Sequence, residues 1–124
     1  MKLPSTVMVG GIPHTVSYHD KPSDVDLFQR ESMWGQHDPW TKSIRVYKDD
    51  NPYASIFKVL LHEIIHGYGV EWNMDELTSH CEKAEENVDV YVRMFFDILS
   101  SNPWMSDAIE EIYHEKQNCA NLSM

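Results

Sequence analysis

The segment Leu60-Leu61-His62-Glu63-Ile64-Ile65-His66-Gly67 contains the pattern His-Glu-x-x-His within an apolar run. On an α-helix, residues four positions apart lie about 40° apart around the axis. His62 and His66 are therefore expected on one helix face, where two imidazoles can occupy two corners of a tetrahedral zinc ion. Glu63 stands beside them and could accept a proton from a water activated by the metal. The pattern predicts a catalytic zinc (Zn2+) site carried by a helix.

The residues before this motif carry a helix-start signal. Asp49-Asp50-Asn51-Pro52 offers capping side chains followed by a proline suited to the first turn. We predict a helix from about Tyr53 to Gly67 or Gly69, because either glycine could end it. Its apolar stripe is expected to contain Ile56, Phe57, Leu60, Leu61 and Ile64. At about 100° per residue, the two histidines fall on the face opposite this stripe.

The N-terminal half is rich in strand patterns. β-branched residues flank Gly10-Gly11, which is a turn signal, and Pro13 is typical of an edge position. The pattern predicts a hairpin at Val7–Tyr18 and a loop or short helical turn at Asp20–Arg30. A third strand is expected at Ser32–His37, a turn at Asp38–Lys42 and a fourth strand at Ser43–Tyr47. We therefore expect a small, mostly antiparallel sheet of about four strands.

The C-terminal half predicts two further helices. Asn73 and Asp75 are capping residues, and apolar residues then recur at steps of three and four until Asn102-Pro103, which would end the helix. The expected ranges are Met74–Ser101 for a long helix, Trp104–Lys116 for a shorter one and Asn118–Met124 for a frayed tail. The fold class is thus α+β, with the sheet first and the helices after it, in a single domain over residues 1–124.

A catalytic zinc site needs a third protein ligand and one open position. The extended pattern His-Glu-x-x-His-x-x-Gly-x-x-His is not met, because Trp72 stands at its last position although Gly69 matches. The following helix is the other source of a ligand, and its candidate side chains are Glu76, His80, Glu82, Glu85, Glu86 and Asp89. Among the acids, helix geometry places Glu85 closest to the buried stripe, so we predict Glu85 as the ligand, with His80 and Glu86 as the main alternatives.

Composition narrows the classes of function. The 124 residues carry a formal net charge of −10, which opposes binding to nucleic acid or to an anionic membrane because no basic stripe is available. Cys81 and Cys119 form no CxxC pair and no disulfide framework, so we expect free thiols in a reducing cytoplasm. We expect neither a secretion signal nor a membrane span, since no stretch approaches roughly 20 apolar residues.

In this combination of features, the chain resembles the small phage-encoded zinc metallopeptidase-like proteins of the wider zincin-like class, which includes SprT-like and ImmA/IrrE-type peptidases. The resemblance covers about residues 7 to 105 and rests on His62-Glu63-x-x-His66, Glu85-x-x-Val88 and Asn102-Pro103. It implies a minimal zincin fold, a phage or prophage origin and residence in the cytoplasm of a bacterial host. It also implies Glu85 as a metal ligand.

The function that we predict is a zinc-dependent metallopeptidase. His62, His66 and Glu85 would hold the zinc, and Glu63 would be the general base that later returns its proton to the leaving amine. The substrate would be a peptide or protein, and a partner protein could complete the cleft because a 124-residue chain leaves little material for its walls. The candidates for an oxyanion donor are His80, Tyr91 and His114.

Two other functions compete with this prediction. The chain could be a binding or regulatory module of phage origin that keeps the zincin scaffold with weak or no catalysis. Intact His62, Glu63 and His66 favour activity, because a purely structural metal site has no use for Glu63. A DNA-associated protease, as SprT-like relatives suggest, is opposed by the negative net charge and by the lack of zinc-ribbon cysteines.

Overall fold

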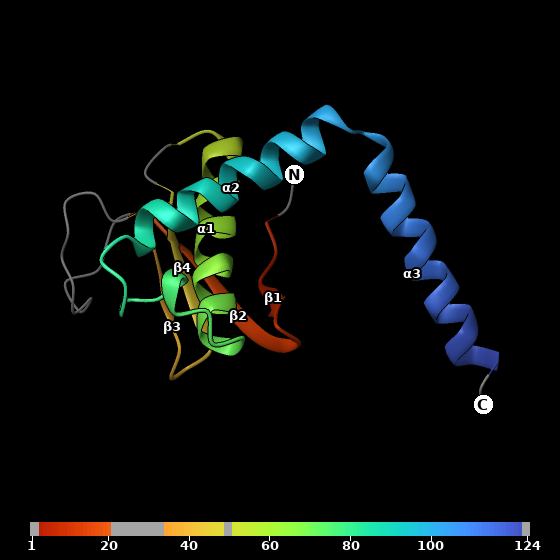
Figure 1. The fold of residues 1–124 in the computed structure, drawn as a ribbon, viewed down its shortest axis with the longest axis horizontal. Helices are drawn as coiled ribbons and strands as arrows, with labels where there is room; N and C mark the ends of the chain where they lie inside the picture. Colours follow the sequence, from red (N-terminus) through yellow and green to blue (C-terminus); the bar gives the residue numbers. More distant parts are fainter. Residues whose placement is uncertain (1–2, 21–33, 49–50, 123–124) are drawn as a thin grey trace. The chain divides into compact units, whose positions relative to one another are not determined.

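The computed structural model describes residues 3–20, 34–48 and 51–122, with the side chains of 118–122 excepted. The fold class is α+β, as predicted. The strands are β1 (Thr6–Val9), β2 (Ile12–His19), β3 (Gly35–Asp38) and β4 (Ser43–Tyr47). The helices are α1 (Tyr53–Glu71), the 3-10 turn η1 (Asp75–Leu77), α2 (Ala84–Ser101) and α3 (Trp104–Leu122). Figure 1 shows these elements along the chain.

The four strands form one sheet in the order β1-β2-β4-β3. The pairs β1–β2 and β3–β4 are antiparallel, and β2–β4 is parallel, with Val16 opposite Ile44. The sheet is therefore mostly antiparallel, as expected. The predicted hairpin at Val7–Tyr18 is confirmed, since Gly10 and Gly11 adopt the positive φ values that its turn requires. Residues 21–33, which include most of the expected loop and the start of the expected third strand, lie outside the described residues.

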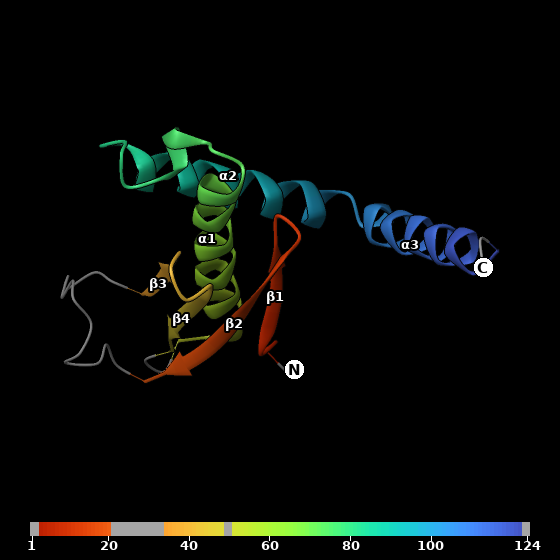
Figure 2. The same cartoon turned by 90° about the horizontal axis from the view of Figure 1, so that it is seen from below.

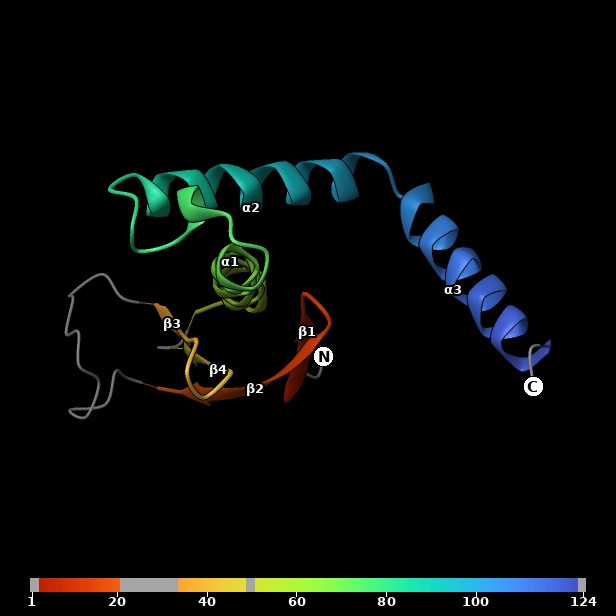
Figure 3. The same cartoon turned by 60° about the horizontal axis from the view of Figure 1, so that its bottom comes forward.

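The chain divides into two compact units, Met1–Val92 and Arg93–Met124, and each is described by itself. In the first unit, α1 packs on one face of the sheet, while η1 and the first turns of α2 lie on the other side of α1 (Figures 2 and 3). The second unit holds the end of α2 and all of α3, and among its described side chains (residues 93–117) none is buried. The prediction of one domain stays a prediction.

Helix α1 has a buried cluster on each side. The cluster toward the sheet contains Val16, Ile44, Val46, Ile56 and Leu60. The cluster toward α2 contains Ile65, Leu77, Val88 and Val92. Because α1 is covered on both sides, the single apolar stripe expected for it is incomplete: Ile65 is buried although the stripe omits it, whereas Phe57 is 38% exposed.

Helix α1 does not end at Gly67 or Gly69, as predicted, but continues to Glu71. Both glycines serve close packing instead. A Cβ at Gly67 would lie 2.8 Å from Val9 Cγ1, and a Cβ at Gly69 would lie 2.9 Å from Leu77 Cβ. The helix ends where Asn73 takes a φ of 54°, a conformation that asparagine tolerates better than most residues.

The long helix predicted from Met74 is also interrupted. Residues 75–77 form η1, and α2 begins only at Ala84. Thr78 stabilises the break, because its hydroxyl donates to the carbonyl of Asp75 at 3.0 Å. The expected end of α2 before Asn102-Pro103 is confirmed. Helix α3 runs to Leu122 and has 19 residues, so it is not shorter than the 18-residue α2, and residues 118–122 are helical rather than a frayed tail.

Candidate metal centre

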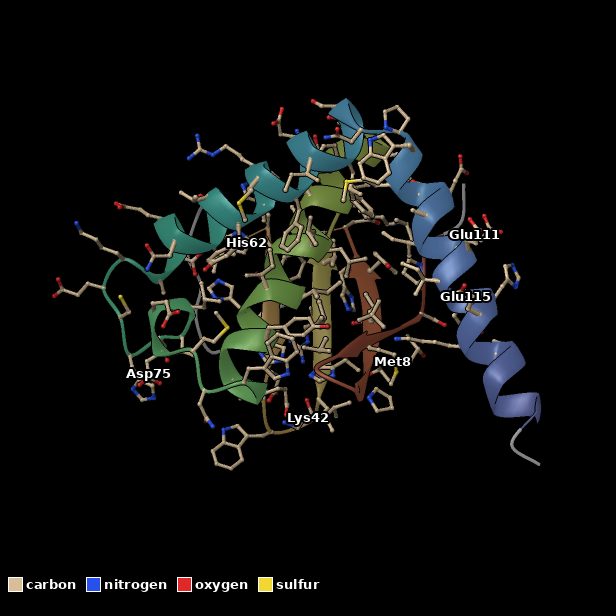
Figure 4. All side chains as sticks on the ribbon, turned by 45° about the vertical axis from the view of Figure 1, so that its right-hand side comes forward. Met8, Lys42, His62, Asp75, Glu111 and Glu115 are labelled. Atoms are coloured by element: carbon tan, nitrogen blue, oxygen red, sulfur yellow. The ribbon has the colours of Figure 1, made fainter. Side chains whose placement is uncertain are left out.

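His62 and His66 lie one turn apart on α1, and their side chains face α2 and η1. Their Nε2 atoms are 3.1 Å apart, and the two rings meet edge to face with centroids 4.8 Å apart. Both side chains are largely buried, at 17% and 16% exposure. Figure 4 shows His62 on the side of α1 that faces α2. The shared helix face predicted from the spacing is therefore present.

Glu85, in the first turn of α2, brings its carboxylate to both histidines. Its Oε2 lies 2.8 Å from His62 Nε2, and its Oε1 lies 3.0 Å from His66 Nε2. Among the acids weighed from the sequence, Glu85 is the one that reaches both Nε2 atoms, and Asp89 contacts the other nitrogen of His62. In a tetrahedral zinc site with bonds of about 2.0 Å, ligand atoms lie about 3.3 Å apart, close to the separations found here.

The outer nitrogens of both rings have hydrogen-bond acceptors. His66 Nδ1 donates to the carbonyl oxygen of Leu77 at 2.8 Å, and His62 Nδ1 donates to Asp89 Oδ1 at 3.0 Å. Metal-bound histidines typically donate their second N–H to a carbonyl or carboxylate, which fixes the tautomer and the ring orientation. Neither role was predicted from the sequence. The spacing of Asp89, four residues after Glu85 on the same helix face, was a usable signal for one of them.

This pattern of donors and acceptors calls for a cation. With Nδ1 protonated on each ring, a neutral imidazole presents a lone pair at Nε2. Two such lone pairs and the carboxylate of Glu85 then meet within 3.1 Å of one another. Three acceptors this close repel each other unless protons or a metal ion lie between them. The donor set fits a divalent metal of the zinc class, for which imidazole and carboxylate are common ligands.

The pKa values of His62, His66 and Glu85 also indicate that this site stabilises positive charge. Burial favours neutral imidazoles, but the hydrogen bonds to Glu85 outweigh it, so the pKa values of His62 and His66 are raised. The hydrogen bonds from His62 and His66 hold the pKa of Glu85 well below its usual range. Without metal, Glu85 is therefore a carboxylate that stabilises protons on the histidines.

Glu63 is buried between α1 and the edge strand β3, with 6% of its surface exposed. A ligand atom from each of His62, Glu63 and His66 lies within 4.8 Å of the others, so the carboxylate of Glu63 is beside the histidines. Burial raises the pKa of Glu63 to about 7, and the backbone N–H of His37 donates to the carboxylate. This position suits a proton acceptor better than a metal ligand.

Strand β3 approaches Glu63 closely because residue 35 is glycine. A Cβ there would lie 2.9 Å from Val59 Cγ1 and 3.0 Å from Glu63 Cγ. This segment was predicted as a strand, without a connection to the site. No short-range signal marks that connection, because it depends on how the sheet packs against α1.

The three candidates for an oxyanion donor are not gathered at the histidines. His80 is exposed, and its backbone N–H points to Thr78 Oγ1. Tyr91 is half-buried and packs against the cluster of Ile65, Leu77, Val88 and Val92. His114 belongs to the other compact unit and lies 3.9 Å from Glu110.

The chain was compared with known protein families, curated proteins and solved structures. No protein-family model, curated protein or solved structure matches the chain. None of the helices in the described part of the chain is long and apolar enough to cross a membrane. The arrangement of His62, Glu63, His66 and Glu85 therefore has to be interpreted from its own chemistry.

Proposed function

We propose that this chain is a zinc-dependent metallopeptidase. One observation carries the proposal: the Nε2 atoms of His62 and His66 converge with the carboxylate of Glu85, while each Nδ1 is held by its own acceptor. Two histidines and one carboxylate are the ligand set of many catalytic zinc sites, in which a fourth position stays open. Four-ligand structural sites mostly use cysteine, which this cluster lacks.

When bound, zinc supplies a Lewis acid that polarises a peptide carbonyl and lowers the pKa of water. Glu63 accepts the proton of the attacking water and then delivers it to the leaving amine. Its pKa of about 7 suits both steps near neutral pH, because a general base works best when its pKa is close to the working pH. The hydrogen bond from the backbone of His37 keeps the carboxylate at the site.

The proposed class of substrate rests on the motif and on charge. His-Glu-x-x-His is typical of zinc metallopeptidases, and a chain with a net charge of −10 is poorly suited to phosphate backbones, so a peptide or protein is the substrate we propose. Phage origin and a cytoplasmic location in a bacterial host remain part of the proposal and rest on the resemblance in the sequence motifs.

The test combines metal analysis with peptide cleavage. Zinc-loaded protein is incubated with a mixed peptide library, and new termini are identified by mass spectrometry. We expect the wild type to bind one zinc per chain and to produce new termini, whereas Glu63→Gln keeps the zinc and produces none. Glu86→Gln is the matched control, because Glu86 is exposed on α2. Equal cleavage by Glu63→Gln and the wild type would disprove the mechanism. Zinc binding by a wild type that cleaves no peptide would disprove peptidase activity and favour a binding module.

A further inference from the structure

A second pair of histidines lies on the face of the sheet that α1 covers, beside Gly67. His14 comes from β2 and His37 from β3, and their rings stack with centroids 5.3 Å apart and planes 23° apart. His14 is fully buried. The Nε2 atoms of both rings are buried, and neither has a hydrogen-bond partner among the residues that the structure describes.

The tautomer of His14 is determined by the hydrogen bond of its Nδ1 atom. Nδ1 donates to the carbonyl oxygen of Ile12 at 2.9 Å, so Nε2 of the neutral ring carries an unused lone pair. Leaving one buried polar atom without a partner costs about 1–3 kcal/mol. One shared partner that supplies positive charge or protons would satisfy both atoms.

The ring of His37 is neutral near neutral pH. Burial, together with the neighbouring His14, lowers the pKa of His37 to about 4, so a proton does not compete for its ring. The nearby carboxylate of Glu71 is paired with Lys42, so the histidine nitrogens are the donors that remain.

We propose that His14 and His37 form a second site, which binds a late first-row transition-metal ion through their Nε2 atoms. Imidazole is a preferred ligand of copper, zinc and nickel, whereas magnesium and calcium prefer oxygen ligands. His14 already has the tautomer that this binding requires, and His37 needs its proton on Nδ1. The site needs neither zinc at His62 and His66 nor peptide hydrolysis, so it stands or falls separately from the proposed function.

Copper(II) is the probe of choice, because divalent ions of this series bind nitrogen ligands most tightly at copper. The experiment uses the full chain with His62→Ala and His66→Ala, which removes the first site. We expect one copper per chain after dialysis, with nitrogen couplings in the electron paramagnetic resonance spectrum. Adding His14→Phe or His37→Phe should weaken binding by more than about 100-fold, since even loss of an outer partner costs about 10–100-fold.

Phenylalanine keeps a planar ring in the packed space and removes both nitrogens, although its ring is somewhat larger than imidazole. His19→Phe is the matched control, because His19 lies on β2 and is exposed. Circular dichroism and thermal melting in chelator establish that each variant is folded, and His37→Gln replaces His14→Phe if the latter does not fold. Copper binding that His37→Phe or His37→Gln leaves unchanged would overturn the proposal.

Discussion

Glu85 Oε2 lies 2.8 Å from His62 Nε2, across 23 residues of sequence, and this contact joins α2 to α1 at the candidate metal centre. The same carboxylate reaches His66 through its other oxygen at 3.0 Å. One side chain thus connects both histidines of the motif to a different helix. The position of α2 against α1 is therefore part of the site, and substitutions on α2 test it directly.

Removing the carboxylate of Glu85 should weaken zinc binding. Structural zinc sites with four ligands contribute about 10–16 kcal/mol, so the loss of one ligand should cost roughly 100-fold or more in affinity. We expect this loss for Glu85→Ala in competition with a chelator dye, and no change for Glu86→Ala on the same exposed turn. Zinc at a free concentration of 100 Kd should also raise the free energy of unfolding of the wild type by about 2.7 kcal/mol, and therefore its melting temperature. Equal affinities for the two variants would exclude Glu85 as a ligand.

Asp89 should tune the site without binding the metal. Its Oδ1 accepts the Nδ1–H of His62, and outer partners of this kind contribute about 10–100-fold in metal affinity. Asp89→Asn should therefore bind zinc more weakly than the wild type but more tightly than Glu85→Ala. The measurement is the same competition assay, with Glu86→Gln as the control. An affinity below that of Glu85→Ala would mean that Asp89 is itself a ligand.

Glu63 should make the metal-free protein sensitive to pH. Its pKa rises from 4.5 in the unfolded chain to about 7 in the folded one, so the folded state binds the extra proton. The contribution of Glu63 to stability is then greatest below pH 4.5 and falls as the pH rises through about 7, by up to about 3 kcal/mol. In chelator, Glu63→Gln should be more stable than the wild type at pH 8, and this advantage should vanish near pH 4. Urea denaturation at both values measures it, and an equal advantage at both would refute the assignment.

Gly69 should be required both for stability and for the metal centre. Alanine normally stabilises a helix relative to glycine by about 0.5–1 kcal/mol. Here the new Cβ would lie 2.9 Å from Leu77 Cβ and 3.2 Å from the Leu77 carbonyl carbon, and that carbonyl holds His66. We expect Gly69→Ala to lower stability by about 1–3 kcal/mol and to weaken zinc binding. Ser55→Ala, at an exposed position of α1, should do neither. A rise in melting temperature for Gly69→Ala would contradict this packing.

Local patterns were sufficient for most elements. The Gly10-Gly11 hairpin, the strand Ser43–Tyr47, the start of α1 at Tyr53 and the end of α2 at Ser101 agree with the structure. Each of these elements is specified by residues close in sequence: by the residues of a turn, by alternating apolar and polar side chains, or by a proline next to the end of a helix. Predictions failed where distant segments meet, because the close approach of Val9 and Leu77 keeps Gly67 and Gly69 inside α1.

The sequence by itself determined that His62, Glu63 and His66 share one turn of a helix, because the spacing of side chains on a helix is a property of the backbone alone. Helix geometry also selected Glu85 among several acids. Only the tertiary structure decided which groups hold the outer nitrogens, how deeply Glu63 is buried and that His14 meets His37. These contacts depend on the packing of α1 between the sheet and α2, which brings together side chains that no local pattern connects.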